Sequence, residues 1–135
     1  MPLPPTTVPL FVYGSLRPGM ALWPMLRDHV VRSQPASVRG RLFWHSSMEY
    51  PVLTIGTGAD ASCHGELLLL RPGDEVNRVI VDEELLYGYD ARWVRVRTRT
   101  GLEEAVVLVW NRDTDLGPEI VGGDYTLVAT DLAQG

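Results

Sequence analysis

The sequence predicts an α+β fold in which a small mixed, barrel-like β-sheet is flanked by short helices. Strand-like segments outnumber helical ones along the chain, and the helices are too few to cover both faces of a doubly wound sheet. The 135 residues are 45% hydrophobic and 21% charged. This length and composition predict one globular domain over residues 1–135 with a single core.

The first half of the chain is expected to open with a Pro/Thr-rich lead-in over residues 1–9. A buried strand follows at Leu10-Phe11-Val12-Tyr13, an apolar run that stops at Gly14-Ser15. Residues 20–31 are predicted to hold a short helix, with Pro24 near its start, where proline is tolerated. Residues 38–44 alternate in polarity and predict a strand with one solvated face. A short extended piece at 50–53 and a loop at 56–61 complete this half.

The second half is expected to contain a strand, a helix and a hairpin. Residues 63–70 are the strand candidate, and the run ends at Pro72-Gly73. Asp74 is expected to cap a helix that continues to about Leu86. Residues 92–100 and 105–110 are predicted to pair around Thr100-Gly101, and residues 125–129 to form a last short strand.

The charge balance excludes several classes of function. The net charge is −5 and all twelve basic residues are arginine. Nucleic-acid binding by bulk charge is therefore disfavoured. A Walker A phosphate loop, a Schiff-base lysine and a Ser-Lys dyad are excluded because each needs lysine. No apolar run approaches the ~18 residues of a membrane helix and no secretory signal is evident, so we expect a cytoplasmic protein without membrane contact.

The cysteine and histidine content gives no support for a metal site. Cys63 is the only cysteine, so an internal disulfide and a cysteine-based metal site are both impossible, and we expect it to be a small core residue. The three histidines, His29, His45 and His64, lack the spacing of metal ligands. We expect surface or hydrogen-bonded histidines at these positions.

The segment Phe11-Val12-Tyr13-Gly14-Ser15-Leu16-Arg17-Pro18-Gly19 is the first candidate site. A strand that ends in Gly-Ser leaves backbone N–H groups free to bind a carboxylate or a developing oxyanion. Gly14 permits a close approach of the backbone. The alternative is a tight turn without a ligand. Ser15 is a weak nucleophile candidate, because the pattern is not Gly-x-Ser-x-Gly and no histidine is placed to serve it.

The helix over residues 74–86 carries the second candidate site. At ~100° per residue, its apolar residues fall on one face: Val76, Val79, Ile80, Leu86 and Tyr87. Glu83 lies at the centre of that face and Glu84 at its edge. A carboxylate in such a place should have a raised pKa and is a candidate general base. The alternatives are an ion pair with an arginine such as Arg92, or a frayed and solvated helix end.

These segments together resemble the gamma-glutamylcyclotransferase-like (AIG2-like) family. The Phe-Val-Tyr-Gly-Ser-Leu-Arg-Pro-Gly run resembles its N-terminal signature. Further matches follow in the family's order: Gly40-Arg41-Leu42, Tyr50-Pro51, His64-Gly65-Glu66-Leu67, a helix ending in glutamate, Tyr89 with Arg92, and Gly123-Asp124-Tyr125. The resemblance covers about residues 10–127.

The resemblance implies a small mixed β-barrel with flanking helices and a cavity at one end. It also implies a cofactor-free reaction, in which the α-amine of a γ-glutamyl group attacks its own γ-carbonyl and releases 5-oxoproline and a free amine. Glu83, or Glu84 as second choice, would act as general acid and base. The substrate would be held by Tyr13, Gly14, Ser15 and Leu16, with Tyr89 and Tyr125 also at the site. The implied partner is a small γ-glutamyl compound; the oligomeric state is not indicated.

The helix departs from the family's usual Leu-Asp-x-x-Glu-Gly pattern. Counted back from Glu83, the leucine and aspartate places hold Val79 and Ile80, and no glycine follows. Counted from Glu84, they hold Ile80 and Val81. The sequence therefore leaves open two further functions for the same site. One is a γ-glutamyl-ligand binding protein without catalysis, and the other is an amide hydrolase in which water replaces the attacking amine.

Overall fold

The computed structural model describes residues 7–56 and 61–127 and contains a closed barrel with the strand order β1-β5-β2-β6-β7. The barrel strands are β1 (Val8–Val12), β2 (Val30–Arg39), β5 (Ser62–Leu70), β6 (Asp90–Thr98) and β7 (Gly101–Val109). The barrel is mixed, because β1 runs parallel to β7 while the other pairs are antiparallel. The predicted α+β fold with a small mixed barrel is therefore confirmed.

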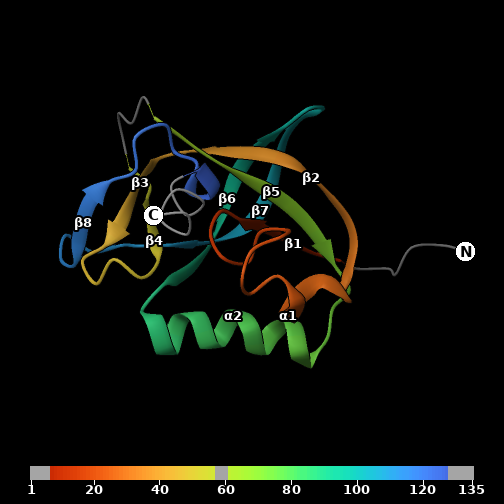
Figure 1. Cartoon of the computed structure of the whole chain (residues 1–135). Coiled ribbons are helices and arrows are strands. Elements are labelled where there is room, and N and C mark those ends of the chain that lie inside the picture. Colours follow the sequence, from red (N-terminus) through yellow and green to blue (C-terminus); the bar gives the residue numbers. More distant parts are fainter. Residues whose placement is uncertain (1–6, 57–60, 128–135) are drawn as a thin grey trace, which may run out of the picture.

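A second, three-stranded sheet lies beside the barrel (Figure 1) and has the order β4-β3-β8. Its strands are β3 (Arg41–His45), β4 (Pro51–Thr54) and β8 (Leu116–Glu119). Two helices, α1 (Pro24–Arg27) and α2 (Asp74–Tyr87), lie on the same side of the barrel. None of the helices in the described ranges is both long and apolar enough to span a membrane.

The alternation of side chains along β1 divides the apolar interior into two parts. Phe11 points into the barrel with residues such as Val38, Leu67 and Val107. Leu10 and Val12 point the other way, into a layer between the barrel wall and the two helices. β1 is buried on both faces, which explains its continuous apolar sequence.

The short helix predicted within residues 20–31 is present between β1 and β2 and begins at Pro24, as expected. Only Pro24–Arg27 are helical, and Val30 already belongs to β2. The β-branched pair Val30-Val31 favours a strand, and β2 gains a long antiparallel partner in β5. The strand predicted over residues 38–44 is divided at Gly40. A side chain there would lie 2.7 Å from the carbonyl oxygen of Thr54, so glycine permits the close passage from barrel to second sheet.

The second half of the chain follows the prediction more closely. The hairpin is confirmed, since β6 pairs with β7 from Asp90↔Val109 to Thr98↔Gly101. The helix is also confirmed, although its N-cap is Gly73 and Asp74 is its first residue. Both Asp74 and Glu75 stand in the first turn, where negative charge interacts favourably with the helix dipole.

Three smaller predictions were wrong, and a fourth is mostly untested. β8 includes Gly117-Pro118, which the sequence indicated as a break. Residues 125–127 are helical, not extended. The lead-in predicted over 1–9 is shorter, because Val8 and Pro9 pair with β5. Most of the loop predicted at 56–61, and the remainder of both termini, lie outside the described residues.

Candidate active site

The loop that follows β1 presents free backbone amides. In the described part of the chain, the N–H groups of Gly14, Ser15 and Leu16 donate to no backbone or side-chain acceptor, whereas Arg17 N donates to Gly14 O at 3.0 Å. The turn therefore leaves successive amides available for an anionic or carbonyl oxygen. Gly14 is needed for packing as well, because a Cβ at this position would lie 2.9 Å from Pro51 Cγ.

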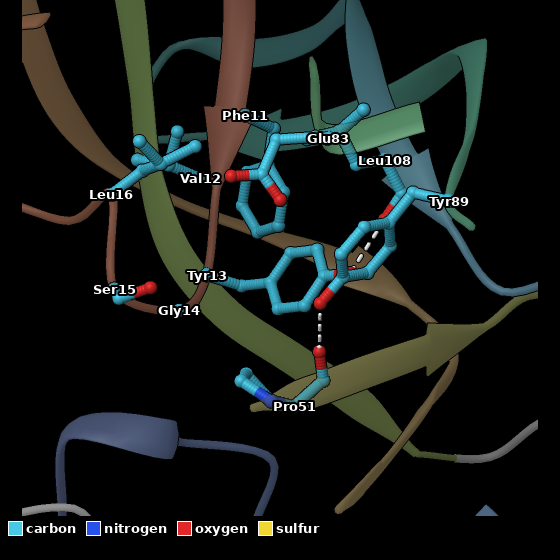
Figure 2. A pocket seen from close by; sticks show the side chains of 10 residues that line it. All are labelled: Phe11, Val12, Tyr13, Gly14, Ser15, Leu16, Pro51, Glu83, Tyr89 and Leu108. Carbon is cyan, nitrogen blue, oxygen red and sulfur yellow. Dashed lines mark hydrogen bonds between the residues drawn. The ribbon is translucent and has the colours of Figure 1, made fainter. Parts of the chain in front are cut away.

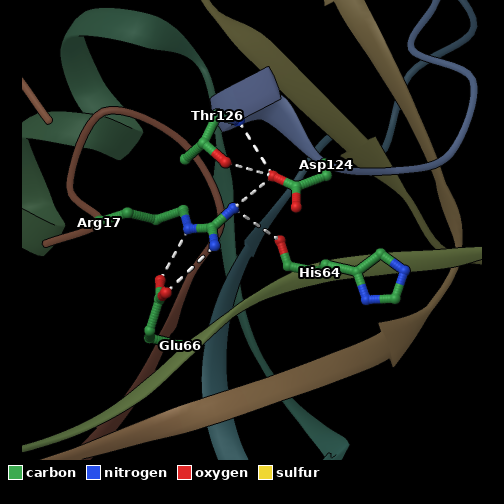
Figure 3. Close-up of polar contacts among 5 residues, drawn as sticks. All are labelled: Arg17, His64, Glu66, Asp124 and Thr126. Atoms are coloured by element: carbon green, nitrogen blue, oxygen red, sulfur yellow. Dashed lines mark hydrogen bonds and ion pairs between the residues drawn. The ribbon is translucent and has the colours of Figure 1, made fainter. Parts of the chain in front are cut away.

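Arg17 holds this loop against two distant parts of the chain (Figure 3). Its guanidinium binds Glu66 on β5 through two hydrogen bonds, of 2.7 and 3.0 Å, and Asp124 near the C-terminal helix at 2.8 Å. Asp124 in turn accepts hydrogen bonds from the Thr126 hydroxyl and amide. The Arg17 side chain is only 11% exposed. The loop conformation is therefore held by partly buried, charge-assisted bonds rather than by the turn alone.

Helix α2 brings Glu83 to the opposite side of the same space. Val76 and Val79 anchor the helix on the barrel wall, and Glu83 follows one turn after Val79 on the same face. The helix ends at Gly88, whose φ of +86° reverses the chain and lets its N–H bond to the last turn. The reversal returns Tyr89 to the pocket. Helix and C-terminal turn thus place Glu83 and Tyr89 side by side.

The pocket formed by these elements encloses about 380 Å³ of empty space including its open mouth. Its lining is drawn in Figure 2 and consists of the following residues: Phe11, Val12, Tyr13, Gly14, Ser15, Leu16, Pro51, Glu83, Tyr89 and Leu108. Apart from the loop amides and one carboxylate, the wall is mostly apolar and aromatic. A small polar head group held at its ends fits such a site.

Two tyrosines form the floor and are fixed by hydrogen bonds to backbone oxygens. Tyr13 donates to Leu108 O and Tyr89 donates to Pro51 O, each at 2.5 Å. Burial raises the pKa of both hydroxyls; the neighbouring Tyr89 raises that of Tyr13 further, and the Glu83 carboxylate raises that of Tyr89 further. Both therefore stay protonated near neutral pH, and their protons are engaged with the backbone. They shape the pocket rather than exchange protons with a ligand.

The carboxylate of Glu83 is the one titratable group that the described pocket leaves uncompensated. It makes no hydrogen bond or ion pair with any described residue, and Figure 2 shows it at the pocket wall, drawn over the Phe11 ring. Burial, and then the negative charge of Asp82, raise its pKa to about 7. The alternative pairing with Arg92 is not formed, because Arg92 binds Asp90 at 2.7 Å. A group with this pKa can both accept and return a proton near neutral pH.

Glu84 is placed differently from Glu83 despite being its neighbour. Its Oε2 accepts a hydrogen bond of 3.2 Å from the amide of Ala91 at the start of β6, and it does not line the pocket. The predicted apolar face of α2 also ends early, because Leu86 is 73% and Tyr87 43% exposed. In the last helical turn Tyr87 contacts only the edge of the Tyr50 ring, and it stays more exposed than Val76 and Val79.

The structure brings most of the predicted site residues together. Six of them line the pocket: Tyr13, Gly14, Ser15, Leu16, Glu83 and Tyr89. Tyr125 does not line it, because its ring is buried edge-on against Trp44 at 5.4 Å. The sequence reasoning missed Pro51 as a wall of the pocket and the pairing of Arg17 with Glu66 and Asp124. All four lie in segments that it singled out, but nothing in a sequence shows which of them meet.

Among the residues that the structure describes, the remaining reactive side chains form no second centre. Cys63 is fully buried, and burial raises the pKa of its thiol to about 12. His29 pairs with Glu75 at 2.8 Å, and His45 stacks on Tyr50. Within the described ranges, no group of histidine, cysteine or carboxylate side chains is arranged to hold a metal ion.

Comparison with known proteins gives the family to which this fold belongs. The family described as "Gamma-glutamyl cyclotransferase, AIG2-like" matches residues 10–127, which is most of the chain. The protein belongs to this family. No curated protein matches it in sequence.

Solved structures share the fold at low sequence identity. YkqA from Bacillus subtilis is 22% identical with a TM-score of 0.74, and the match covers 96% of this chain but 44% of YkqA. The chain thus spans less than half of that protein. PH0828 from Pyrococcus horikoshii is 22% identical with a TM-score of 0.63, covering 94% of this chain and 97% of PH0828. An AIG2-like protein from Mus musculus is 17% identical with a TM-score of 0.69, covering 89% of this chain and 88% of the mouse protein.

Proposed function

We propose that the protein is a cofactor-free γ-glutamyl-amine cyclotransferase that releases 5-oxoproline and a free amine. The α-nitrogen of the γ-glutamyl group forms a bond to its own γ-carbonyl carbon. The bond from that carbon to the amine nitrogen then breaks. The attacking ammonium loses two protons as it becomes the lactam N–H, and the leaving nitrogen gains two as it departs as an ammonium, so neither water nor an oxidant is consumed.

Glu83 carries this proposal. An unpaired, half-buried carboxyl with a pKa of about 7 can take the proton from the attacking ammonium and deliver a proton to the leaving nitrogen. General acid–base help of this kind is worth typically 10²–10⁴-fold. Glu84 is the weaker candidate, because its carboxylate is engaged by the Ala91 amide outside the pocket.

The loop amides supply the second half of the mechanism. The free N–H groups belong to Gly14, Ser15 and Leu16, residues that line the same pocket as Glu83 (Figure 2). They can hold the oxygen atoms of the γ-glutamyl group and stabilise negative charge that develops on the carbonyl. A fixed geometry also favours ring closure, because the attacking and attacked atoms belong to one substrate. Tyr13 and Tyr89 contribute the shape of the cavity.

The test is detection of 5-oxoproline by mass spectrometry from a panel of γ-glutamyl amines and γ-glutamyl amino acids. We expect product from the wild type, and loss of product in Glu83→Gln, which keeps the size of the side chain but not its basicity. Glu84→Gln is the matched control and should retain turnover. Unchanged turnover in Glu83→Gln would reject Glu83 as the base.

A second candidate function is binding of γ-glutamyl ligands without turnover, and it is favoured by Ile80. This residue occupies the place of the aspartate in the family's helix pattern and packs against the apolar layer under α2. Under this alternative, γ-glutamyl ligands would raise the melting temperature without being consumed.

The third possibility is amide hydrolysis, which can be distinguished from cyclisation by acetylating the α-amine of the substrate. Acetylation blocks cyclisation but leaves hydrolysis possible.

A further inference from the structure

We propose that the protein binds a nucleotide on the outer face of its barrel, with the phosphates in a hollow beside β2 and β6 and the base on Trp93. The hollow encloses about 620 Å³ of empty space including its open mouth. Its lining consists of the following residues: Ser37, Arg39, Ser62, Arg95, Arg97 and Leu102. None of them lines the pocket of Glu83, so this site is separate from the proposed reaction and does not depend on it.

The strand register brings the three arginines of the hollow together. Within the described ranges, β2 and β6 pair at one position only, Ser37↔Arg97. Because the two strands are antiparallel, Arg39 and Arg95 lie on the same side of that position, each two residues away from it. Residues two apart point to the same face of a strand, and the residues between them point into the barrel core. The arginines therefore share the outer face, where Ser62 of β5 lies opposite Arg39.

The hollow is positively charged although the chain as a whole is negative. The net charge is −5, yet three of the twelve arginines line this hollow and no carboxylate does. Among the described residues, the side chains of Arg39 and Arg97 form no ion pair and no hydrogen bond. Arg95 pairs with Glu104 at 3.5 Å, but both side chains are exposed, so this pair contributes little. Like charges repel at such close positions, and a bound anion would remove that repulsion.

The donors of the hollow fit phosphate groups. A guanidinium presents its N–H donors in a planar fork that matches two phosphate oxygens. The hydroxyls of Ser37 and Ser62 can donate further hydrogen bonds. Three cations match the charge of an oligophosphate, which exceeds the charge of a single carboxylate. The open mouth leaves room for the rest of the ligand to extend along the surface.

Trp93 provides a surface for an aromatic base beside the hollow. Its side chain is 64% exposed, whereas Trp44 and Trp110 are buried. It stands two residues before Arg95 on β6, so it lies on the same outer face, ~7 Å further along the strand. No other ring and no guanidinium of the described residues stacks on it. Nucleobases stack on exposed aromatic rings, and the phosphates of a nucleotide stacked here would extend toward the arginines.

A free nucleotide fits this face better than a nucleic-acid strand. Affinity for a strand comes from many phosphate contacts over an extended surface. Here the hollow belongs to a chain with a net charge of −5, and β7 beside it carries Glu103 and Glu104. A long polyanion would be repelled outside the hollow, whereas a single nucleotide would not extend beyond it and Trp93.

The test is the binding of ATP, measured by isothermal titration calorimetry at low salt. We expect Arg39→Gln and Arg97→Gln each to weaken the binding by roughly tenfold, because each removes charge-assisted bonds to phosphate. Arg32→Gln is the matched control. It removes the same charge from an exposed position of β2 that does not line the hollow, and should change the affinity by about twofold at most. Added salt should weaken binding to the wild type.

The contribution of the base is tested with tripolyphosphate, which has none. Trp93→Leu should weaken the binding of ATP by roughly tenfold and leave the binding of tripolyphosphate unchanged. Urea unfolding checks that the variants fold. Arg39→Gln and Arg97→Gln should be at least as stable as the wild type, because each removes a charge that repels its neighbours.

Three results would overturn this inference. The site would be rejected if the wild type did not bind ATP, or if Arg39→Gln and Arg97→Gln bound it as tightly as Arg32→Gln does. Equal affinity of the wild type for ATP and tripolyphosphate would reject the role of Trp93 and the nucleotide as ligand. Tighter binding of a single-stranded oligonucleotide than of ATP would indicate a nucleic-acid surface instead.

Discussion

Two groups of carboxylates flank the loop between β1 and α1, and they differ in how their charge is compensated. On one side, Glu66 and Asp124 share the Arg17 guanidinium (Figure 3). Burial alone would raise the pKa of Asp124, but bonds from Thr126 and the charge of Arg17 outweigh it and lower that pKa. On the other side, Glu83 has no partner among the described residues, and its pKa rises to about 7.

This difference in charge compensation gives the two groups different roles: the paired carboxylates stabilise the fold, and the unpaired one is reactive. The ion pairs of Glu66 and Asp124 with Arg17 hold the loop in one conformation. The unpaired carboxylate is a poor structural element, because burying its charge costs free energy. The same cost makes it a proton carrier near pH 7. The following four predictions test this contrast, beginning with the largest effect.

The largest effect is expected from Glu83→Gln. Removal of the proposed acid and base should lower kcat by roughly 10²–10⁴-fold with little loss of stability, since glutamine has the same shape and no charge to bury. Glu84→Gln should change kcat much less. Initial rates of 5-oxoproline release measure both variants. A similar loss in the two would show that the helix charge as a whole, not one carboxylate, matters.

The next effect is on folding, through Arg17→Met. This change leaves Glu66 and Asp124 without their shared cation, and we expect the free energy of unfolding to fall by about 2–3 kcal/mol. Arg27→Met is the matched control, because Arg27 pairs with Asp28 at 3.7 Å with both side chains exposed. Its effect should stay below about 1 kcal/mol. Urea unfolding at neutral pH measures both, and equal effects would contradict a stabilising role for the Arg17 network.

The third effect is on the pH dependence of stability. The pKa of Glu83 is higher in the folded protein, about 7, than its ordinary value of 4.5. Between these values the folded state binds the extra proton, so stability contributed by protonated Glu83 is lost as pH rises through about 7. Allowing for solvent screening of a partly exposed group, the loss is on the order of 1 kcal/mol.

Glu83→Gln should remove that component. The melting temperature of the variant, relative to the wild type, should therefore be more favourable at pH 8 than at pH 5. The acidic limb of the kcat/KM profile should lie near the same pKa, because the base must be deprotonated to act. A wild-type stability profile that Glu83→Gln leaves unchanged would mean that the Glu83 pKa is not raised.

The smallest effect is expected from Arg92→Ala. Arg92 binds Asp90 on the surface and not Glu83. The change should alter stability by no more than about 0.5 kcal/mol and leave the pH–rate profile in place. The profile is the decisive measurement. A shift of its acidic limb to higher pH would show that Arg92 stabilises the Glu83 carboxylate after all.

The strands and the helix that build the site could be predicted wherever the local pattern was strong. β1 and β5 are continuous apolar runs, and the β6–β7 hairpin alternates around Thr100-Gly101. The short helix within residues 20–31 was predicted with Pro24 near its start, but its end was not, because β2 begins at Val30 and pairs over a long stretch with β5. The prediction failed at β8 because an edge strand tolerates Gly117-Pro118.

For the candidate site, the sequence by itself determined the residue types. A glycine-rich turn after β1 and a glutamate on the apolar face of α2 follow from spacing and composition, which are local properties of the chain. Only the tertiary structure decided between Glu83 and Glu84 as the residue lining the pocket, excluded Tyr125 from its wall and joined Arg17 to Glu66 and Asp124. The physical reason is that burial and ion pairing depend on which distant segments meet when the barrel closes, and 107 positions separate Arg17 from Asp124.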